Sequence, residues 1–207
     1  MKFGIRFAVG LFALTCVVPL IAANAPVAVA PTPSQSHVHY LADGRAGVPE
    51  DYRDWPFLSS GLNMNYSDPA PTPDHAMFDN VFVSPESLRA FRTTGTWPDG
   101  TVFVKEDRMG STKGSINKSG QFQSENIMAM EMHIKDAARF KGGWAFFISG
   151  DSGPLAVLPE SASCYSCHGS HGAVDTTFVQ FYPSILDVAR RKGTLSAGYR
   201  HDEGAAH

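Results

Sequence analysis

Thr101-Val102-Phe103-Val104-Lys105-Glu106 alternates with the period of a β-strand and is the strongest indication of the fold class. Thr101, Phe103 and Lys105 fall on one face of this strand, and the other three side chains fall on the opposite face. The residues just before it, Trp97 to Gly100, have the composition of a tight turn. A strand that follows a turn rather than a long helix favours antiparallel pairing.

Two further runs, residues 75–83 and 127–135, alternate in a similar way and predict neighbouring strands. The apolar run at 144–148 predicts a buried strand. Ser84-Pro85 has the form of a helix start, with serine as the cap and proline at the first helical position. A second, closing helix is expected over residues 184–192. The intervening residues 110–124 are rich in Gly, Ser and Lys and predict a mobile loop. The predicted fold class is therefore α+β, an antiparallel β-sheet packed by short helices.

The two ends of the chain differ from this central part. Lys2 and Arg6 precede an uncharged apolar run that ends in small residues, which is the pattern of a secretory signal peptide over residues 1–25. We expect a disordered leader over residues 26–38, one domain over 39–195 and a disordered tail over 196–207. Cleavage leaves 15 basic and 20 acidic residues without a basic cluster, so nucleic-acid binding is not expected. Export predicts a periplasmic protein.

The motif Cys164-Tyr165-Ser166-Cys167-His168 contains the only two cysteines left after that cleavage. Its C-x-x-C-H spacing is typical of c-type haem attachment, because two thiols add to the porphyrin vinyl groups and the next histidine lies under the ring. We therefore expect one covalent haem c, attached near the C-terminal part of the chain, with His168 as the iron ligand. A disulfide between the two cysteines is the alternative.

The ordered set of motifs resembles the cytochrome P-460 family and its relative, cytochrome c′-β. The resemblance implies an antiparallel sheet packed by helices, often a homodimer, with a five-coordinate haem c. It rests on the following stretches: residues 52–55, 80–83, 97–106, 130–136 and 143–146, the motif at 164–168, and residues 175–183.

The resemblance implies two chemistries that differ on the distal side of the haem. Members of the P-460 type carry a lysine bound to the porphyrin edge and oxidise hydroxylamine. Members of the c′-β type cap the iron with phenylalanines and bind nitric oxide without enzymatic activity. Lys105 is the candidate cross-link; the alternative is a lysine that reaches solvent. Lys135 is the second choice, and Lys113 and Lys118 lie in the expected loop. The candidate phenylalanines are Phe78, Phe82 and Phe103.

The sixth iron position is expected to be open. Met128, Met130 and Met132 repeat every second residue, which on a strand indicates core packing rather than ligation. His133 falls on the opposite strand face and is expected to be a polar surface residue, whereas His171 follows the motif too closely to reach the far side of the ring. A six-coordinate electron carrier remains the third hypothesis. The oxidase hypothesis also needs an electron acceptor, such as another periplasmic cytochrome c, and a proton-transfer carboxylate. The carboxylate candidates are Glu131, Asp136 and Glu160.

Overall fold

An antiparallel meander of six strands forms the centre of the fold, in the order β3-β4-β5-β6-β7-β8. The computed structural model describes Met1 and residues 37–66, 74–149 and 153–205. Each strand pairs with the next along the chain, and the predicted fold class is confirmed. The strands are β3 (Phe57–Leu62), β4 (Met77–Val83), β5 (Val102–Ser111), β6 (Phe122–Lys135), β7 (Trp144–Ser149) and β8 (Ala156–Val157).

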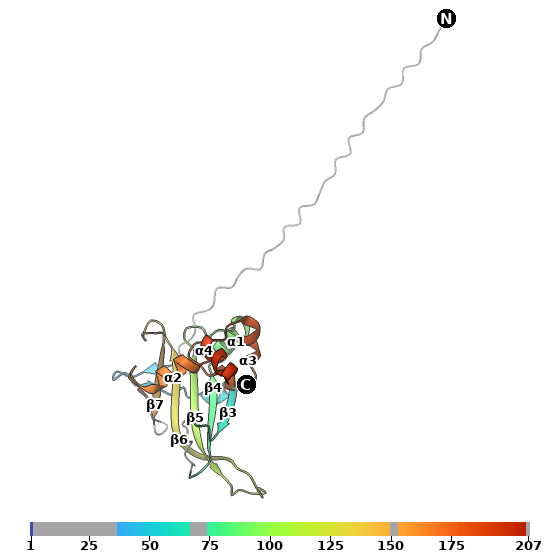
Figure 1. The fold of residues 1–207 in the computed structure, drawn as a ribbon. Helices are drawn as coiled ribbons and strands as arrows, with labels where there is room; N and C mark the ends of the chain where they lie inside the picture. The colour runs from blue at the N-terminus through green and yellow to red at the C-terminus, as the bar shows by residue number, and fades with distance from the viewer. Residues whose placement is uncertain (2–36, 67–73, 150–152, 206–207) are drawn as a thin grey trace. The chain divides into compact units, whose positions relative to one another are not determined.

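Short elements flank this sheet. Figure 1 shows α1, α3 and α4 gathered near one end of the sheet, with the β5–β6 hairpin extending at the other. The flanking elements are β1 (His39–Tyr40), β2 (Ala46–Gly47), the 3-10 helix η1 (Tyr52–Asp54), α1 (Pro85–Thr94), α2 (Ser163–His171), the 3-10 helix η2 (Val179–Phe181), α3 (Leu186–Lys192) and α4 (Ala197–Ala205). Among the described residues, no helix is both long and apolar enough to cross a membrane.

The period-two alternation of β5 divides the core into two clusters, one on each face of the sheet. Phe103 packs with residues of the C-terminal helices and turns, such as Tyr182 and Ile185. Val102 and Val104 pack on the other face, where Met130 and Met132 are also buried. The prediction that these methionines pack in the core is confirmed for Met130 and Met132. The third, Met128, is partly exposed.

The predicted helix starts are close to those observed, but one detail differs. Ser84 precedes α1, and Pro85 is its first residue. The Ser84 hydroxyl does not bond to the first turn of backbone; it donates to the Ser87 hydroxyl instead. Gly95 ends the helix in the left-handed conformation that favours glycine.

One prediction of disorder is wrong, and another holds only in its central part. Of the expected loop at 110–124, residues 112–121 form the turn of a hairpin, whereas both ends are strand, because β5 and β6 remain paired as far as Ser111 and Phe122. The expected tail contains α4, because Tyr199 supplies a buried anchor that a tail rich in small and charged residues does not suggest. The signal peptide and most of the leader lie outside the described residues. The last two leader residues are described, and His37 bonds to Glu86.

Candidate haem site

The Cys164–His168 motif lies in α2, a helix of nine residues. Positions three apart in a helix share a face, so the spacing places both cysteines on one side of α2. Both thiols are free, so the alternative disulfide is not formed. Tyr165, between the cysteines, anchors the helix on the sheet: its hydroxyl donates to the Leu158 carbonyl at 3.1 Å. Its ring packs edge-on against Phe146 of β7.

A hydrogen bond orients the His168 ring. His168 Nδ1 lies 2.7 Å from the Thr176 carbonyl oxygen, so Nδ1–H donates to that oxygen and Nε2 keeps its lone pair. Histidines that ligate metals are held in this way by a second hydrogen bond on the other ring nitrogen. Burial lowers the pKa of His168, which favours the neutral ring that a metal requires.

The turn that carries Thr176 is itself fixed to the sheet. Thr177 accepts a 2.9 Å hydrogen bond from the indole Nε1 of Trp97, in the turn before β5. The Thr176 hydroxyl lies 3.2 Å from His133 Nε2 on β6. Trp97 is 2% exposed, so its hydrogen bond to Thr177 is shielded from solvent. The turn predicted from Trp97 to Gly100 therefore contributes indirectly to the position of the His168 ring.

His168 lines a cavity of about 390 Å³ between the sheet and the C-terminal segment. The sheet supplies residues from the five neighbouring strands β3 to β7, and α2 and η2 close the other side. Ligand cavities of this size are common in proteins that bind a cofactor. Its lining includes Met64, Met77, Asp79, Phe103, Lys105, Asp107, Glu131, His133 and Phe178.

Lys105 faces this cavity, and its ammonium group is held by carboxylates. Lys105 Nζ lies 2.6 Å from Asp107 Oδ1, 3.2 Å from Glu131 Oε1 and 3.6 Å from Asp79 Oδ1. Burial alone would lower the pKa of Lys105, but the three carboxylates outweigh it and raise the pKa above its ordinary value. The side chain therefore keeps its charge despite partial burial, and it is a paired, 30% exposed cation in the cavity wall.

The other candidate lysines are placed elsewhere. Lys135 donates to the Trp97 carbonyl at 2.8 Å and pairs with Asp175. Lys113 and Lys118 lie at the turn of the β5–β6 hairpin. Among the described lysines, Lys105 is the one that lines the cavity. Of the three candidate carboxylates, Glu131 lies in the cavity, whereas Asp136 pairs with Arg139 and Glu160 is exposed.

Of the three candidate phenylalanines, only Phe103 lines the cavity. Phe78 and Phe82 share a face of β4 as predicted, but Met77, Asp79 and Val81 are the β4 residues that line the cavity with His168. Phe82 instead packs edge-on against Tyr52 and Phe57 on the other side of the sheet. The strand alternation was predicted correctly, but the sequence does not indicate which face of β4 covers the cavity.

His133 is not the surface residue expected from its pattern. It is 8% exposed, its ring stacks on Phe146 at 4.0 Å, and it lies 5.3 Å from the His168 ring. Burial lowers the pKa of His133 well below its ordinary value. His171, by contrast, points away from the site and pairs with Asp202 of α4 at 2.7 Å. The cavity-lining Met64, Met77, Asp79 and Asp107 were not identified from the sequence.

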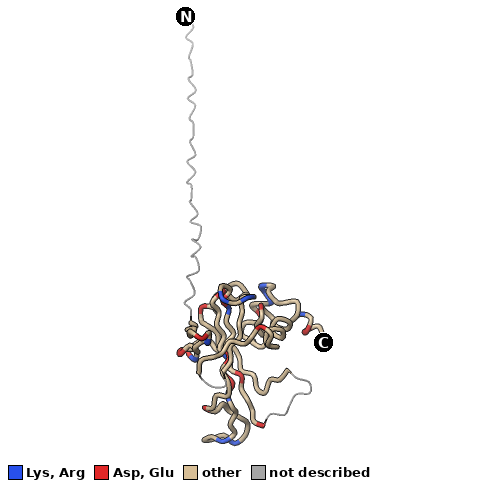
Figure 2. Tube along the Cα trace, turned by 90° about the vertical axis from the view of Figure 1, so that its left-hand side faces the viewer, with Lys and Arg blue, Asp and Glu red and all other residues tan. Residues whose placement is uncertain are grey.

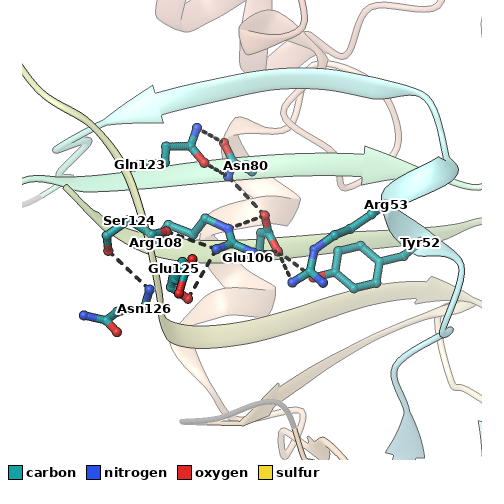
Figure 3. A network of polar contacts seen from close by, with 9 residues as sticks. All are labelled: Tyr52, Arg53, Asn80, Glu106, Arg108, Gln123, Ser124, Glu125 and Asn126. Atoms are coloured by element: carbon teal, nitrogen blue, oxygen red, sulfur yellow. Dashed lines mark hydrogen bonds and ion pairs between the residues drawn. The ribbon is translucent and has the colours of Figure 1, made fainter. Parts of the chain in front are cut away.

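Behind the cavity, a polar network fixes the strand that carries Lys105 (Figure 3). Glu106 points to the opposite face from Lys105 and is 3% exposed. It accepts hydrogen bonds from Tyr52 at 2.5 Å, from Arg108 at 2.7 and 3.2 Å, and from Arg53 at 3.2 Å. Burial disfavours the carboxylate, but these donors outweigh it and lower the pKa of Glu106 to about 2. Asn80 adds a weaker contact from β4.

These residues fit a haem group. A C-x-x-C-H helix supplies two free thiols and an oriented imidazole, and a cavity beside the imidazole has aromatic walls. Together with the antiparallel sheet, they define a β-rich c-type cytochrome. Residues 49–179, more than half of the chain, match the family model Cytochrome P460. The chain therefore belongs to the cytochrome P460 family, whose cofactor is a c-type haem. A search of curated proteins finds no match to it.

Proposed function

We propose that this chain is an exported, single-haem cytochrome of the P-460 type that oxidises hydroxylamine at an open, five-coordinate iron. The haem is bound covalently through Cys164 and Cys167, and His168 is the proximal ligand. The observation that carries the proposal is the position of Lys105, whose amine shares one cavity with the His168 imidazole. The P-460 chemistry requires a lysine that can reach the porphyrin edge, and the c′-β type lacks the link between lysine and porphyrin.

The bound haem supplies the redox chemistry, which amino-acid side chains cannot provide. The residues of the chain bind it, orient it and manage protons. Each electron removed from hydroxylamine leaves a proton that needs an acceptor. Glu131 is the partly exposed carboxylate of the cavity, so it can accept a proton there and release it to solvent. The electrons pass to a periplasmic acceptor such as another cytochrome c.

Lys105 forms the cross-link only after losing a proton, because an ammonium group is not a nucleophile. The nearest acceptor for that proton is Asp107, at 2.6 Å. The strand geometry restricts where the amine can reach. Lys105 extends from β5 on the same side as Phe103. Glu106, on the other face, is held by hydrogen bonds such as that from the Tyr52 hydroxyl. This arrangement supports one lysine, fixed in place, as the modified residue.

A c′-β-like nitric oxide binder is the second candidate, and one observation favours it. Phe103, one of the candidate caps, lines the cavity, whereas Phe178 stacks on the proximal His168 ring at 4.1 Å and so belongs to the proximal side. An apolar cap of this kind suits a diatomic ligand. The carboxylates around Lys105 make the facing wall polar, however, and the second candidate assigns no role to them.

Peptide mapping of the purified holoprotein tests the proposal. After digestion, haem should carry both the Cys164–His168 peptide and the peptide containing Lys105. The reduced protein should absorb far to the red of an ordinary c-type spectrum. Lys105→Met should retain haem but give an ordinary spectrum, whereas the control Lys135→Met should keep both features. Haem attached only to the Cys164–His168 peptide in the wild type would reject the oxidase and favour nitric oxide binding.

The iron coordination provides a second test. We expect a high-spin, five-coordinate ferric protein that takes up nitric oxide. Met64, Met77 and Met132 are the cavity-lining thioethers that could compete for the sixth position. A low-spin spectrum that becomes high-spin in Met64→Leu, Met77→Leu or Met132→Leu would establish the electron carrier instead. Dimerisation remains a prediction, and sedimentation of the holoprotein tests it.

A further inference from the structure

Two buried carboxylates face each other across β4 and β5 in the wall of the cavity. Asp79 and Asp107 are direct partners in the strand register and are 9% and 5% exposed. Like charges placed directly opposite in a sheet destabilise it. Asp107 Oδ1 lies close to Lys105 Nζ, but it is buried and accepts no aligned hydrogen bond. The pair therefore depends on the lysine charge.

We propose that Asp79 and Asp107 form a carboxyl pair that takes up the proton lost by Lys105 when its amine is modified, and that the pair then holds this proton as an acid–base group of the cavity. The inference rests on the proposed function, because linkage is the event that removes the lysine charge. It assigns to these two residues a role that neither the motif nor Glu131 provides.

The covalent step requires a two-electron oxidant, which we assign to a peroxide. A bond forms between Lys105 Nζ and a carbon of the porphyrin edge. The ammonium group first gives one proton to the carboxyl pair. One N–H bond and one C–H bond then break, and their two protons and two electrons reduce the peroxide to two water molecules. A cation and a carboxylate are replaced by a neutral secondary amine and a neutral carboxylic acid.

The charges around the pair favour a proton there once the lysine has lost its charge. Burial raises the pKa of Asp79 to about 6 even though Lys105 opposes the shift. Loss of the lysine charge removes that opposition, so the pKa of Asp79 rises further. Two buried carboxyl groups next to each other commonly share one proton for the same reason.

The other titratable groups around the pair do not reverse its tendency to hold a proton after the lysine charge is lost. Among the described residues that line the cavity, they are Lys105 on β5, Glu131 and His133 on β6, Tyr66 after β3 and His168 on α2. Glu131 is a further carboxylate and favours protonation of its neighbours, whereas the lysine is the nearest cation. Glu106 and Arg108 pair with each other on the opposite face of β5.

Infrared spectroscopy of the holoprotein tests the proposal at pH 7. The probe is the C=O stretching band of a protonated carboxyl group, which shifts in D₂O. Lys105→Met removes the charge without requiring linkage, so this variant should show the band whether or not the wild type is cross-linked. Adding Asp79→Asn or Asp107→Asn to Lys105→Met should abolish the band. Adding Glu131→Gln, the matched control, should leave it in place.

The outcomes separate this inference from the proposed function. If the wild type is linked by peptide mapping, it should show the same band, and unlinked wild type should lack it. The inference is overturned if Lys105→Met lacks the band, if the band persists in both aspartate variants, or if only Glu131→Gln removes it. If the wild type is not linked, the proposed oxidase function is rejected. The presence or absence of the band in Lys105→Met still shows whether the carboxyl pair holds a proton when the lysine charge is missing. Either aspartate variant suffices if the other does not fold.

Discussion

Replacing Glu106 with glutamine should reduce the stability of the holoprotein by about 3 kcal/mol at pH 7. The pKa of Glu106 is about 2 in the folded protein, against 4.5 for a free carboxyl group. At about 1.4 kcal/mol per pH unit, this difference corresponds to about 3 kcal/mol of stabilisation. Because the folded pKa is depressed, the stabilisation is present above pH 4.5 and is lost as the pH falls toward 2. The substitution would also leave Arg53 and Arg108 without their counter-charge.

Chemical denaturation followed by far-UV circular dichroism, at several pH values between about 7 and about 2.5, measures this effect. The wild type should lose stability across the acid range more steeply than Glu106→Gln. Asp187→Asn is the control, because Asp187 is an exposed carboxylate paired with Arg190 and should contribute less than about 0.5 kcal/mol. The reasoning fails if Glu106→Gln matches the wild type at pH 7, or if both proteins show the same dependence on pH.

Two further predictions concern the helix that carries the haem motif. Replacing Cys164 and Cys167 together with Ala should abolish haem that survives denaturation and acid extraction; haem retained through both treatments would contradict covalent attachment. Gly198→Ala should destabilise the protein by about 1–3 kcal/mol, because a Cβ there would collide with the Ser170 carbonyl oxygen of α2. Gly204→Ala, also in α4 but with open space around it, should be neutral or slightly stabilising, and equal melting temperatures for the two variants would contradict this packing.

The parts of the molecule that could be predicted from the sequence are those governed by local chemistry. The alternation of residues 101–106 predicts a strand with Phe103 and Lys105 on one face, and both do line the cavity. The C-x-x-C-H spacing identifies the haem motif because thiol positions and the ligand are adjacent in the chain. The core role of Met130 and Met132 also follows from a period of two on one strand.

Features that depend on contacts between distant segments could not be predicted. The face of β4 that meets the cavity is set by its pairing with β5, so Phe78 and Phe82 were assigned to the wrong side. The sequence around His133 gives no indication of the turn at Thr176 that buries it. Asp79 and Asp107 are 28 positions apart and become neighbours only through the strand register. Acidic and basic residues are interspersed along the fold, so charge composition alone did not reveal the carboxylates around Lys105 (Figure 2).

The two faces of β5 carry carboxylates in opposite electrostatic situations, and the contrast explains how one strand can serve both folding and chemistry. Glu106 has more donors than one carboxylate needs, so it stays ionised and holds the strand in place. Its neighbours Lys105 and Asp107 face a cavity where three carboxylates share one lysine, so charge there is under-compensated. A carboxylate that takes up and releases protons must lack full charge compensation, as around Lys105. A carboxylate that holds a strand in place must be fully compensated, as Glu106 is. Because strand residues alternate in direction, the two arrangements lie one residue apart without sharing partners.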